Sequence, residues 1–210
     1  MRASARRRWS LLLALVSAIL LAGAFAGDAG VQTWIAQHQL PSVQAAMRNV
    51  SRWGDWPSHV VVGLIGVALA YFLDRPRWLA IFAAMVLACA LAGTANCAIK
   101  IVAGRARPAV TADPGWHGPR LSSKYHSFPS GHTAASTAFF AVLLFARPRI
   151  GTPLLAIPIL IGFSRVSTGA HHLSDVVFAA ILGALCGWLV WRWVWSTRWP
   201  ERAQAAGVTC

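Results

Sequence analysis

The chain has 210 residues, of which 57% are apolar and only 12% are charged. A soluble domain carries about 25% charged residues, so this composition excludes the soluble, fibrous and disordered classes and indicates an integral membrane protein. The 19 Lys and Arg against 6 Asp and Glu give a formal charge of +13, which in a membrane chain points to orienting loops, anionic lipid headgroups or an anionic substrate. Nucleic acid is not expected as a partner, because no basic block outside the apolar stretches carries interleaved aromatic residues.

The N-terminal part predicts one membrane anchor followed by a surface segment. Residues 9–27 carry no charge over 19 positions and follow a cluster of four arginines. The apolar core of a secretory signal peptide is only about 7–15 residues long, so we expect an anchor that is not cleaved. Residues 31–56 mix apolar residues with Gln, His, Arg and Pro, and we interpret them as an interfacial or extramembrane connection.

Five further apolar stretches bring the expected number of spans to six. Two of them, 56–73 and 78–99, are long enough to cross a bilayer and are joined by a short connection. The other three have only 14 to 16 uncharged residues: 133–146, 150–164 and 176–191. A span needs about 20 residues, so these helices are expected to extend through the polar residues 130–132, Arg165 and 171–175. Ionisable groups at that depth are typical of a water-filled functional cavity.

The placement of Lys and Arg predicts the orientation of the chain. If the N-terminus is cytoplasmic, 11 of the 19 cations fall on cytoplasmic segments, as the positive-inside rule requires, and the C-terminus is cytoplasmic as well. The other eight cations lie on the outer side: Arg48, Arg52, Lys100, Arg105, Arg107, Arg120, Lys124 and Arg165. Six of these eight fall within 100–165, and cations concentrated on the disfavoured side suggest that an anion is bound there.

Three stretches on this outer side could carry chemistry, and two of them contain residues that typically start or end a helix. The first runs from Lys100 to Pro108, a cationic segment in which the proline ends any continuation of the third span. In the second, Pro129 and Ser130 indicate the start of a helix. Gly131 follows them and would let an oxyanion approach backbone N–H groups at the positive end of the helix dipole.

The third stretch, 164–175, holds a histidine and a carboxylate four residues apart. In a helix, Asp175 could accept a hydrogen bond from one ring nitrogen of His171 and leave the other nitrogen free as a nucleophile. Asp175 could also reach His172, so spacing alone leaves both histidines open. A carboxylate beside His171 favours the imidazolium, and we expect it to raise the pKa of His171 above about 6.5.

Together the three stretches resemble the tripartite signature of the type 2 phosphatidic acid phosphatase superfamily. That signature is Lys, six residues and Arg-Pro; then Pro-Ser-Gly-His; then Ser-Arg, five residues, His, three residues and Asp. The matching residues are Lys100, Arg107, Pro108, Pro129, Ser130, Gly131, His132, Ser164, Arg165, His171 and Asp175. The resemblance covers 56–191 and implies an all-α bundle of six transmembrane helices, with an active site at the outer, periplasmic face of a bacterial inner membrane.

The resemblance also implies a role for each residue. His171 would attack phosphorus and form a phosphohistidine, Asp175 would fix its tautomer, and His132 would protonate the leaving oxygen. The phosphoryl oxygens would be held by Lys100, Arg107, Arg165, Ser130 and the backbone N–H of Gly131. Since protein cations supply the electrostatics, we expect neither a metal nor another cofactor. The family pattern favours His171 over His172.

The expected organisation is an anchor helix with an interfacial connection over 1–55, a phosphatase helical core over 56–195 and a cytoplasmic tail over 196–210. The expected function is hydrolysis of the phosphomonoester or diphosphate of a phospholipid or an isoprenoid lipid. Phosphatidylglycerol phosphate, undecaprenyl diphosphate, phosphatidic acid and a lipid A phosphate all fit. The alternatives are a lipid phosphotransferase, which passes the phosphoryl group to a second lipid, and a non-catalytic binder or transporter of anionic lipid. An orienting carboxylate beside a histidine argues against the last alternative, because binding alone needs no such pair.

A few other residues keep two interpretations. Three cations are either solvated loop charges or contacts to the lipid headgroup: Arg105, Arg120 and Lys124. Gly183 and Gly187 have the spacing of a dimer face, although close packing within one bundle is favoured, and the oligomeric state stays open. Asn96 either caps the Lys100 site from one turn below or bonds a neighbouring helix.

Overall fold

The computed structural model describes residues 2–198 of the chain, and no β-strand occurs in that part. The helices are α1 (Arg2–His38), α2 (Pro41–Trp53), α3 (Trp56–Phe72), α4 (Pro76–Ala103), the 3-10 turn η1 (Ser123–Tyr125), α5 (Gly131–Ala146), α6 (Pro148–Leu154), α7 (Ala156–Ser167) and α8 (Leu173–Arg198). The fold is therefore all-α, as expected. Of the cytoplasmic tail expected over 196–210, residues 199–210 lie outside the described residues.

Local sequence signals explain where the helices begin and end. Proline occupies the first turn of α2, α4 and α6, where its missing N–H costs no intrahelical hydrogen bond. Asp55 caps α3 by accepting a hydrogen bond from the backbone N–H of Trp56 at 2.8 Å. Helix α4 ends at Gly104, which has a positive φ of 54° and whose missing side chain avoids a collision with the carbonyl oxygen of Gly118. These signals place the turns at the two ends of a helical bundle.

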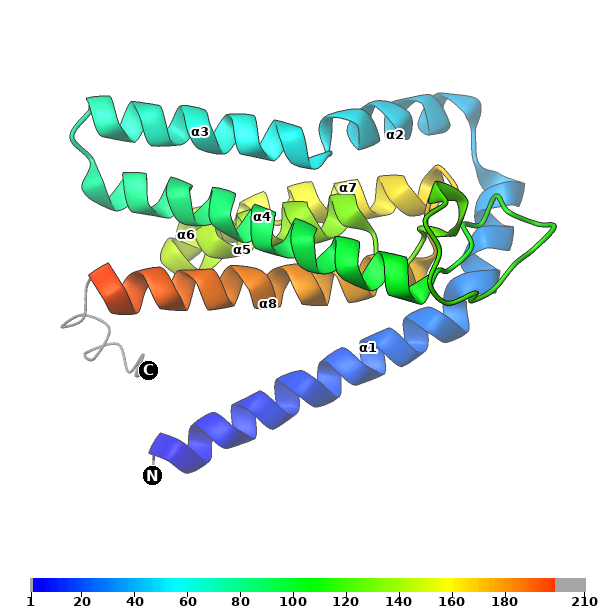
Figure 1. Cartoon of the computed structure of the whole chain (residues 1–210), viewed down its shortest axis with the longest axis horizontal. Helices are drawn as coiled ribbons and strands as arrows, with labels where there is room; N and C mark the ends of the chain where they lie inside the picture. Colours follow the sequence, from blue (N-terminus) through cyan, green and yellow to red (C-terminus); the bar gives the residue numbers. More distant parts are fainter. Residues whose placement is uncertain (1, 199–210) are drawn as a thin grey trace.

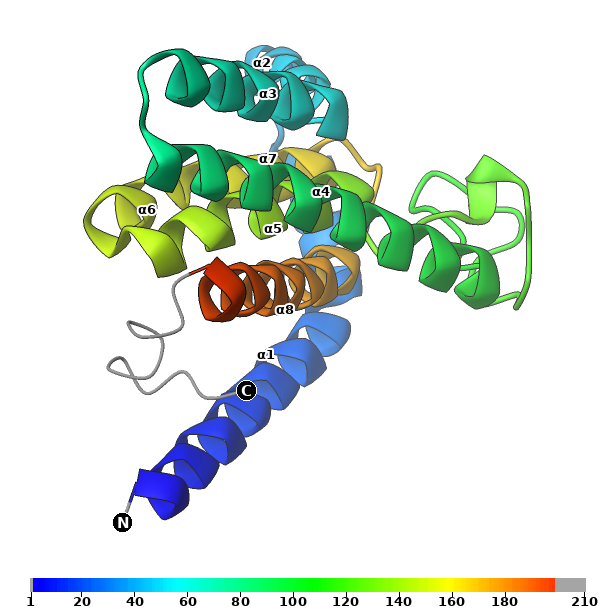
Figure 2. The same ribbon diagram turned by 60° about the vertical axis from the view of Figure 1, so that its left-hand side comes forward.

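The helices run mostly side by side, with α5 at the centre between α4, α8 and α7 (Figure 1). Helix α1 runs at an angle to the bundle and packs against α8 through its C-terminal part, while α2 precedes α3 at a bend and packs against α7. The turn between α3 and α4, helix α6 and the C-terminal end of α8 lie at one end of the bundle (Figure 1). The loop 104–130 lies at the opposite end in both views (Figures 1 and 2), and α2 lies toward that end in Figure 1.

The lengths of the helices bear on the expected six spans. Four helical segments among the described residues are long and apolar enough to cross a membrane: Arg8–His38, Pro76–Ala103, Pro148–Ser167 and Leu173–Thr197. A fifth is the bent pair formed by α2 and α3, with an angle of 51° between them. Helix α5 is apolar but has only 16 residues, so it is the one member of the expected six that falls short.

The segment 31–56, interpreted as an interfacial or extramembrane connection, is mostly helical. Helix α1 continues eleven residues beyond the apolar stretch 9–27 to His38, and α2 occupies Pro41–Trp53. Several polar residues of this segment contact the rest of the protein, as described below for the site.

Small residues allow the central helices to approach closely. Ala88 and Ala92 of α4 and Ala134 of α5 are completely buried. On α8, a Cβ at Gly183 would meet the carbonyl oxygen of Ala134, and a Cβ at Gly187 would meet Ala141. The glycine pair thus packs against α5 within the bundle, which is the favoured one of the two interpretations. Close packing of small residues is the usual means by which membrane helices associate.

Candidate active site

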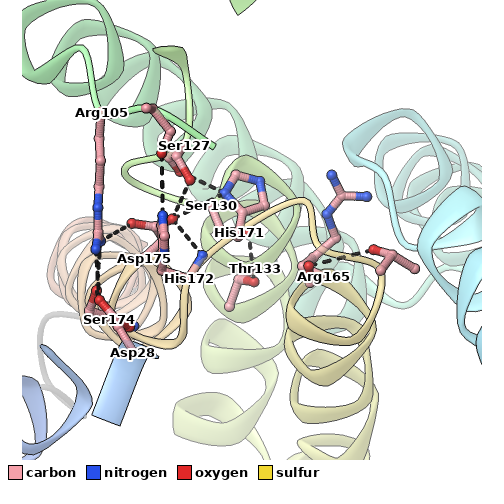
Figure 3. Close-up of polar contacts among 12 residues, drawn as sticks. Asp28, Arg105, Ser127, Ser130, Thr133, Arg165, His171, His172, Ser174 and Asp175 are labelled. Atoms are coloured by element: carbon pink, nitrogen blue, oxygen red, sulfur yellow. Dashed lines mark hydrogen bonds and ion pairs between the residues drawn. The ribbon is translucent and has the colours of Figure 1, made fainter. Parts of the chain in front are cut away.

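The signature residues meet at the end of the bundle that carries the loop 104–130. Lys100 lies in the last turn of α4, Ser130 and His132 lie at the start of α5, and Arg165 lies near the end of α7. The connection from α7 to α8 brings His171 to the same place (Figure 3). Three segments that are distant in sequence therefore supply one site, as the spacing predicted.

Three cations, Lys100, Arg107 and Arg165, lie near one another here, with the carboxylates of Asp55 and Asp175 close by. Lys100 and Arg165 both lie close enough to Arg107 for their positive charges to repel. The ammonium nitrogen of Lys100 is 3.6 Å from the point where a Cβ on Gly131 would sit, so glycine lets this cation approach the N-terminus of α5. Positive charges held this close, beside the positive end of a helix dipole, form a site for an anion.

The guanidinium groups have N–H donors to spare. The Nε atoms of Arg107 and Arg165 are buried and have no hydrogen-bond acceptor among the described residues. Burial lowers the pKa of Arg107, and Asp175 opposes this effect. An arginine remains charged under such conditions. Buried, charged donors without an acceptor are what the oxygens of a phosphoryl group require.

Ser130 and Asn96 border the same region. Ser130 is completely buried, and its Oγ accepts a hydrogen bond from the hydroxyl of Thr133 at 3.0 Å, which leaves its own proton for another acceptor. The side-chain oxygen of Asn96 lies 3.4 Å from the position of a Cβ on Gly131, and its Nδ2 is buried without an acceptor among the described residues. Of its two interpretations, Asn96 therefore fits better as a neighbour of the Lys100 site.

His171 is held differently from the expectation. Its Nδ1 lies 2.6 Å from the carbonyl oxygen of Ser127 but 3.6 Å from Oδ2 of Asp175. A carbonyl can only accept, so Nδ1 carries the proton and Nε2 has the free lone pair. The expected helical turn between His171 and Asp175 does not exist, because α8 begins at Leu173 and the histidine precedes it. The predicted tautomer stands, but Ser127 is the residue that fixes it.

Three other donors lie closer to the carboxylate of Asp175 than the ring of His171 does. Arg105 Nη1 donates to Oδ1 at 2.5 Å, and the hydroxyl of Ser127 and the backbone N–H of His172 donate to Oδ2 at 2.5 Å and 2.8 Å. The carboxylate itself is completely buried. Asp175 therefore orients Ser127 and the 171–172 backbone, and it acts on His171 at slightly longer range.

The pKa of His171 moves in the opposite direction to the one expected. Complete burial of the ring lowers it to about 4, and this effect outweighs the raising influence of Asp175, while the charges of Arg165 and Lys100 lower it further. The expectation failed because it counted the neighbouring carboxylate and left out the loss of water around the ring. The ring of His171 is therefore unprotonated at neutral pH.

His172, the second histidine that the spacing left open, points elsewhere. Its Nε2 lies 3.3 Å from the carbonyl oxygen of Ala106, and only its backbone N–H reaches Asp175. The ring that lies beside Asp175 and near Arg165 and Lys100 is that of His171.

His132 has a carboxylate partner that was not foreseen. Its Nδ1 lies 3.5 Å from Oδ1 of Asp55, the residue that caps α3. Asp175, the other carboxylate of the site, is engaged with Arg105 and Ser127. Burial of the ring and the cations around it disfavour the imidazolium form of His132, and Asp55 favours it.

Further residues missed from the sequence come from the N-terminal helices. Ser51 of α2 accepts a hydrogen bond from Nη1 of Arg165. Gln39 donates to the carbonyl oxygen of Ser167 at 2.8 Å, and Gln32 donates to the carbonyl oxygen of His171 at 3.2 Å. These polar residues belong to the segment 31–56 that was interpreted as a surface connection. Their signal was present as polar residues within helical periodicity, but their partners lie more than 100 residues away.

Arg105 and Asp28 are the other two residues missed. Arg105, interpreted as either a loop charge or a headgroup contact, is only 8% exposed and pairs with Asp28 and Asp175. Asp28 is the only acidic residue among residues 1–54, and it stands directly after an apolar stretch. A lone carboxylate at such a place was a usable signal, because buried carboxylates are almost always paired.

The other two loop cations lie apart from these ion pairs. Lys124 lines an open cleft of about 500 Å³ together with Arg107, Thr111 and Ser123. The guanidinium carbon of Arg120 lies over the ring of Tyr125, 5.5 Å from its centre. Among the described residues, no group of three or more His, Cys, Asp or Glu is arranged to hold a metal ion.

Comparison with known proteins shows the family of the chain. A sequence model described as the PAP2 superfamily matches residues 78–199, more than half of the chain. The chain belongs to the PAP2 superfamily. It is 33% identical over 140 residues to decaprenylphosphoryl-5-phosphoribose phosphatase from Mycolicibacterium smegmatis, an alignment that covers 65% of this chain and 71% of that protein.

Other relatives of this PAP2 protein align over shorter stretches. A lipid A 1-phosphatase from Rhizobium johnstonii is 39% identical over 89 residues, which are 41% of this chain and 36% of that protein. Undecaprenyl-diphosphatase BcrC from Bacillus subtilis is 38% identical over 66 residues, which are 31% of this chain and 34% of that protein. The chain thus spans only about a third of the length of these two relatives.

The fold is also that of a solved PAP2 structure. A transmembrane PAP2 type phosphatidylglycerolphosphate phosphatase from Bacillus subtilis superimposes with a TM-score of 0.65 at 22% identity, over 86% of this chain and 92% of that one. Together with the apolar helices, this likeness identifies the protein as an integral membrane protein of the PAP2 superfamily.

Proposed function

We propose that the protein is a membrane phosphatase that hydrolyses the phosphomonoester or diphosphate of a lipid through a phosphohistidine on His171. The observation that carries this proposal is the pair of buried guanidinium Nε donors without an acceptor, on Arg107 and Arg165, beside an unprotonated His171. This arrangement offers an anion donors on one side and a nucleophile on the other.

In the first step, Nε2 of His171 attacks phosphorus. The N–P bond forms while the bond to the leaving oxygen breaks, and His132 gives its proton to that oxygen. Nδ1–H of His171 stays on the carbonyl of Ser127, 2.6 Å away, and the charge that develops on the ring faces Asp175 at 3.6 Å. Lys100, Arg107 and Arg165 hold the equatorial oxygens.

In the second step, water attacks the phosphohistidine. The neutral His132 now takes a proton from this water, a P–O bond forms, the N–P bond breaks, and inorganic phosphate leaves. His132 is again protonated and His171 is again neutral, so the cycle closes. Asp55 supports both roles of His132, because it stabilises the imidazolium without contacting the substrate.

The substrate class rests on the relatives and on the cleft beside Arg107. The relatives are named for lipid A, undecaprenyl diphosphate and decaprenylphosphoryl phosphoribose, which all present a phosphoryl group at a membrane surface. The cleft of about 500 Å³ has two cations, Arg107 and Lys124, among its lining residues. We place the polar remainder of the substrate there, next to the phosphoryl group bound by Arg107.

The proposed topology has six spans, with α5 as the short one, cytoplasmic termini and the site at the outer face of a bacterial inner membrane. It is supported by the placement of the α3–α4 turn and α6 at the end of the bundle opposite to the loop 104–130 (Figure 1). Reporter fusions after Arg77 and after Arg149 should report the cytoplasm, and a fusion after Asp113 the outer compartment. The reverse pattern would contradict the orientation.

The test of the function is phosphate release by the purified full chain in detergent from four lipids: phosphatidylglycerol phosphate, undecaprenyl diphosphate, phosphatidic acid and lipid A. We expect release from at least one of them, unchanged in EDTA because the cations belong to the protein, and none with His171→Gln. A radiolabelled phosphoryl group that appears on a second lipid instead of in phosphate would show a phosphotransferase. Binding of all four lipids without turnover would leave only the non-catalytic alternative.

A further inference from the structure

A buried cation links helix α1 to the carboxylate behind the nucleophile. The guanidinium of Arg105 donates from Nη1 to Asp175 at 2.5 Å and from Nη2 to Asp28 at 2.7 Å. Asp28 lies on α1, outside the residues 78–199 matched by the family. Figure 3 shows the guanidinium end of Arg105 next to Asp175 on one side and next to Asp28 and Ser174 on another.

Asp28 is held as firmly as Arg105. It accepts hydrogen bonds from the backbone N–H of Ser174 at 2.8 Å and from the hydroxyl of Ser174 at 2.6 Å. The same hydroxyl accepts from Nη1 of Arg105 at 2.7 Å, which closes a ring of hydrogen bonds. In this ring the Arg105 guanidinium has acceptors on both sides and cannot turn away from Asp175.

Contacts within the loop 104–130 also fix the position of Arg105. The backbone on either side of it pairs with the loop, Ala106 N–H to Gly115 at 2.9 Å and His117 N–H to Gly104 at 3.1 Å. The ring of Trp116 lies 4.9 Å from the guanidinium carbon and the ring of Phe25 lies 5.4 Å from it. Aromatic faces of this kind stabilise a cation and exclude water from it. Phe25 comes from α1, so this helix contributes both a ring and a carboxylate.

The chain of contacts ends at the nucleophile. Asp175, held by Arg105, accepts from the hydroxyl of Ser127 at 2.5 Å, and the carbonyl of Ser127 accepts from Nδ1 of His171 at 2.6 Å. Ser127 is also tied to the loop directly, since its N–H donates to the carbonyl of Arg105 at 3.0 Å. A displacement of Arg105 would therefore move both anchors of the His171 ring.

We propose that Asp28 is a positioning residue for the reaction: through Arg105 it holds Asp175 and Ser127 in the arrangement that points Nε2 of His171 at phosphorus. Asp28 itself does not touch the substrate. The inference rests on the proposed phosphatase activity, and it makes α1 a part of the active site as well as a membrane anchor.

The same contacts allow a simpler role, in which Asp28 only caps the first turn of α8 through the N–H of Ser174. The two roles differ in their dependence on Arg105. A residue that acts through Arg105 loses its influence once Arg105 is removed, whereas a cap of α8 keeps it. A double-mutant cycle on the full chain therefore separates them.

The cycle uses Asp28→Asn, Arg105→Gln and the double variant, with Thr33→Ala as the control on α1. Asparagine keeps an oxygen for the cap but removes the charge that holds Arg105, and Thr33 bonds only within its own helix, to Ala29. We expect Asp28→Asn to lower kcat about tenfold to a hundredfold, because small displacements of reacting groups have effects of this size, with KM within about twofold. Thr33→Ala should match the wild type.

In the Arg105→Gln background, Asp28→Asn should change kcat by less than about twofold. It should also raise Tm there, because Arg105→Gln leaves two buried carboxylates without a cation and the second substitution removes one of them. If Arg105→Gln does not fold, Arg105→Lys replaces it, since lysine keeps the charge but cannot bridge both carboxylates in one plane.

The outcomes separate the role of Asp28 from the function itself. A wild type that releases phosphate from none of the lipids would overturn the proposed function and this role with it. An active wild type with an unchanged Asp28→Asn variant would overturn only the role of Asp28. A loss in Asp28→Asn that persists undiminished in the Arg105→Gln or Arg105→Lys background would assign Asp28 to the cap of α8.

Discussion

The helices before residue 76 and the helices after it contribute to the site in different ways. Every residue that would touch the phosphoryl group comes from the later part, which is also the part matched by the family. The earlier part supplies polar side chains that contact those residues or residues next to them: Asp28, Gln32, Gln39, Ser51 and Asp55. The reacting groups are thus embedded in one half of the chain and oriented by the other.

This division has a consequence for how the two parts should respond to substitution. Loss of a group that bonds to the transition state removes its full contribution, whereas loss of a supporting group lets the first group relax into a poorer geometry. We therefore expect a graded series, with large losses in the later part and moderate ones in the earlier part.

The largest effect is expected at the nucleophile. His171→Ala should lower kcat by at least about 10⁴-fold and abolish the phosphoenzyme, because no other group can form the covalent bond. Rapid quench with a ³²P-labelled substrate measures both quantities. His172→Ala is the matched neighbour, and it should keep most of the activity since its ring bonds only the carbonyl of Ala106. A dead His172→Ala with an active His171→Ala would exchange the two roles.

The next prediction compares the two residues of one hydrogen bond, Arg165 and Ser51. Arg165→Gln should lower kcat about a hundredfold to a thousandfold, the usual loss when a charged donor to the transition state is removed. Ser51→Ala removes only the acceptor behind Nη1 of Arg165 and should lower kcat less than about tenfold. Steady-state kinetics on one lipid compares them. Equal losses in the two variants would mean that Ser51 is more than a support.

The third effect concerns pH and follows from the burial of His171. With a pKa of about 4 for this ring, the unprotonated form persists at pH 5, whereas a pKa of 6.5 would leave only about 3% of it, a difference of about thirtyfold. We expect the acid limb of kcat/KM to lie well below pH 6. His132 gains its proton as pH falls, so it cannot cause this limb.

Phosphoenzyme formation between pH 4 and 8 tests this expectation, with the titration of the substrate followed in the same micelles by ³¹P NMR. The limb of Asp175→Asn should lie still lower, because this variant removes the carboxylate that raises the pKa of His171. A limb in the wild type at or above pH 6.5 would show that Asp175 outweighs burial.

The sequence predicted a large share of this structure, and the reasons are physical. The apolar stretches 56–73 and 78–99 agree with α3 and α4 to within a few residues, because helix length in a membrane is set by local composition. The signature also named residues that meet at one end of the bundle, since α4, α5 and α7 each have a terminus there. Composition and spacing are sufficient for such features.

Composition and spacing could not predict the partners of the site residues. Nothing local to Arg105 distinguishes a loop charge from a buried bridge, because Asp28 and Asp175 lie 77 and 70 positions away. The hydrogen bond from His171 to the carbonyl of Ser127 involves backbone, which the identity of a side chain does not encode. The lowered pKa of His171 depends on burial by all of these segments together.

The fourth prediction concerns Asp55, the carboxylate beside His132. Asp55→Asn removes the charge that favours the imidazolium of His132, so the rate on a lipid phosphate should fall about tenfold to a hundredfold, the lower range of general acid catalysis. An activated aryl phosphate needs no proton on its leaving oxygen, and its rate should change little. Comparing the two substrates isolates the acid step.

Asp74→Asn is the control for this variant. Asp74 is exposed in the turn between α3 and α4, at the opposite end of the bundle, and asparagine tolerates its positive φ of 50°. We expect it to behave as the wild type on both substrates. Equal losses on the two substrates in Asp55→Asn would assign Asp55 to the start of α3, whose first N–H it caps.

The smallest effect is expected at Gln32, which contacts only the backbone of the later part. Gln32 on α1 donates to the carbonyl oxygen of His171 at 3.2 Å, one turn beyond Asp28. A neutral hydrogen bond contributes about 0.5–1.5 kcal/mol, and only part of it acts on the transition state, so Gln32→Ala should lower kcat about twofold to threefold. The same assay that ranks Asp28→Asn measures it, with Thr33→Ala again as the baseline.

Because His171 is also held through Ser127, Gln32 should matter more when that second anchor is weakened. Gln32→Ala combined with Asp28→Asn should therefore lose more activity than the product of the two separate losses, and a loss that is simply multiplicative would mean that the two residues of α1 act on His171 independently.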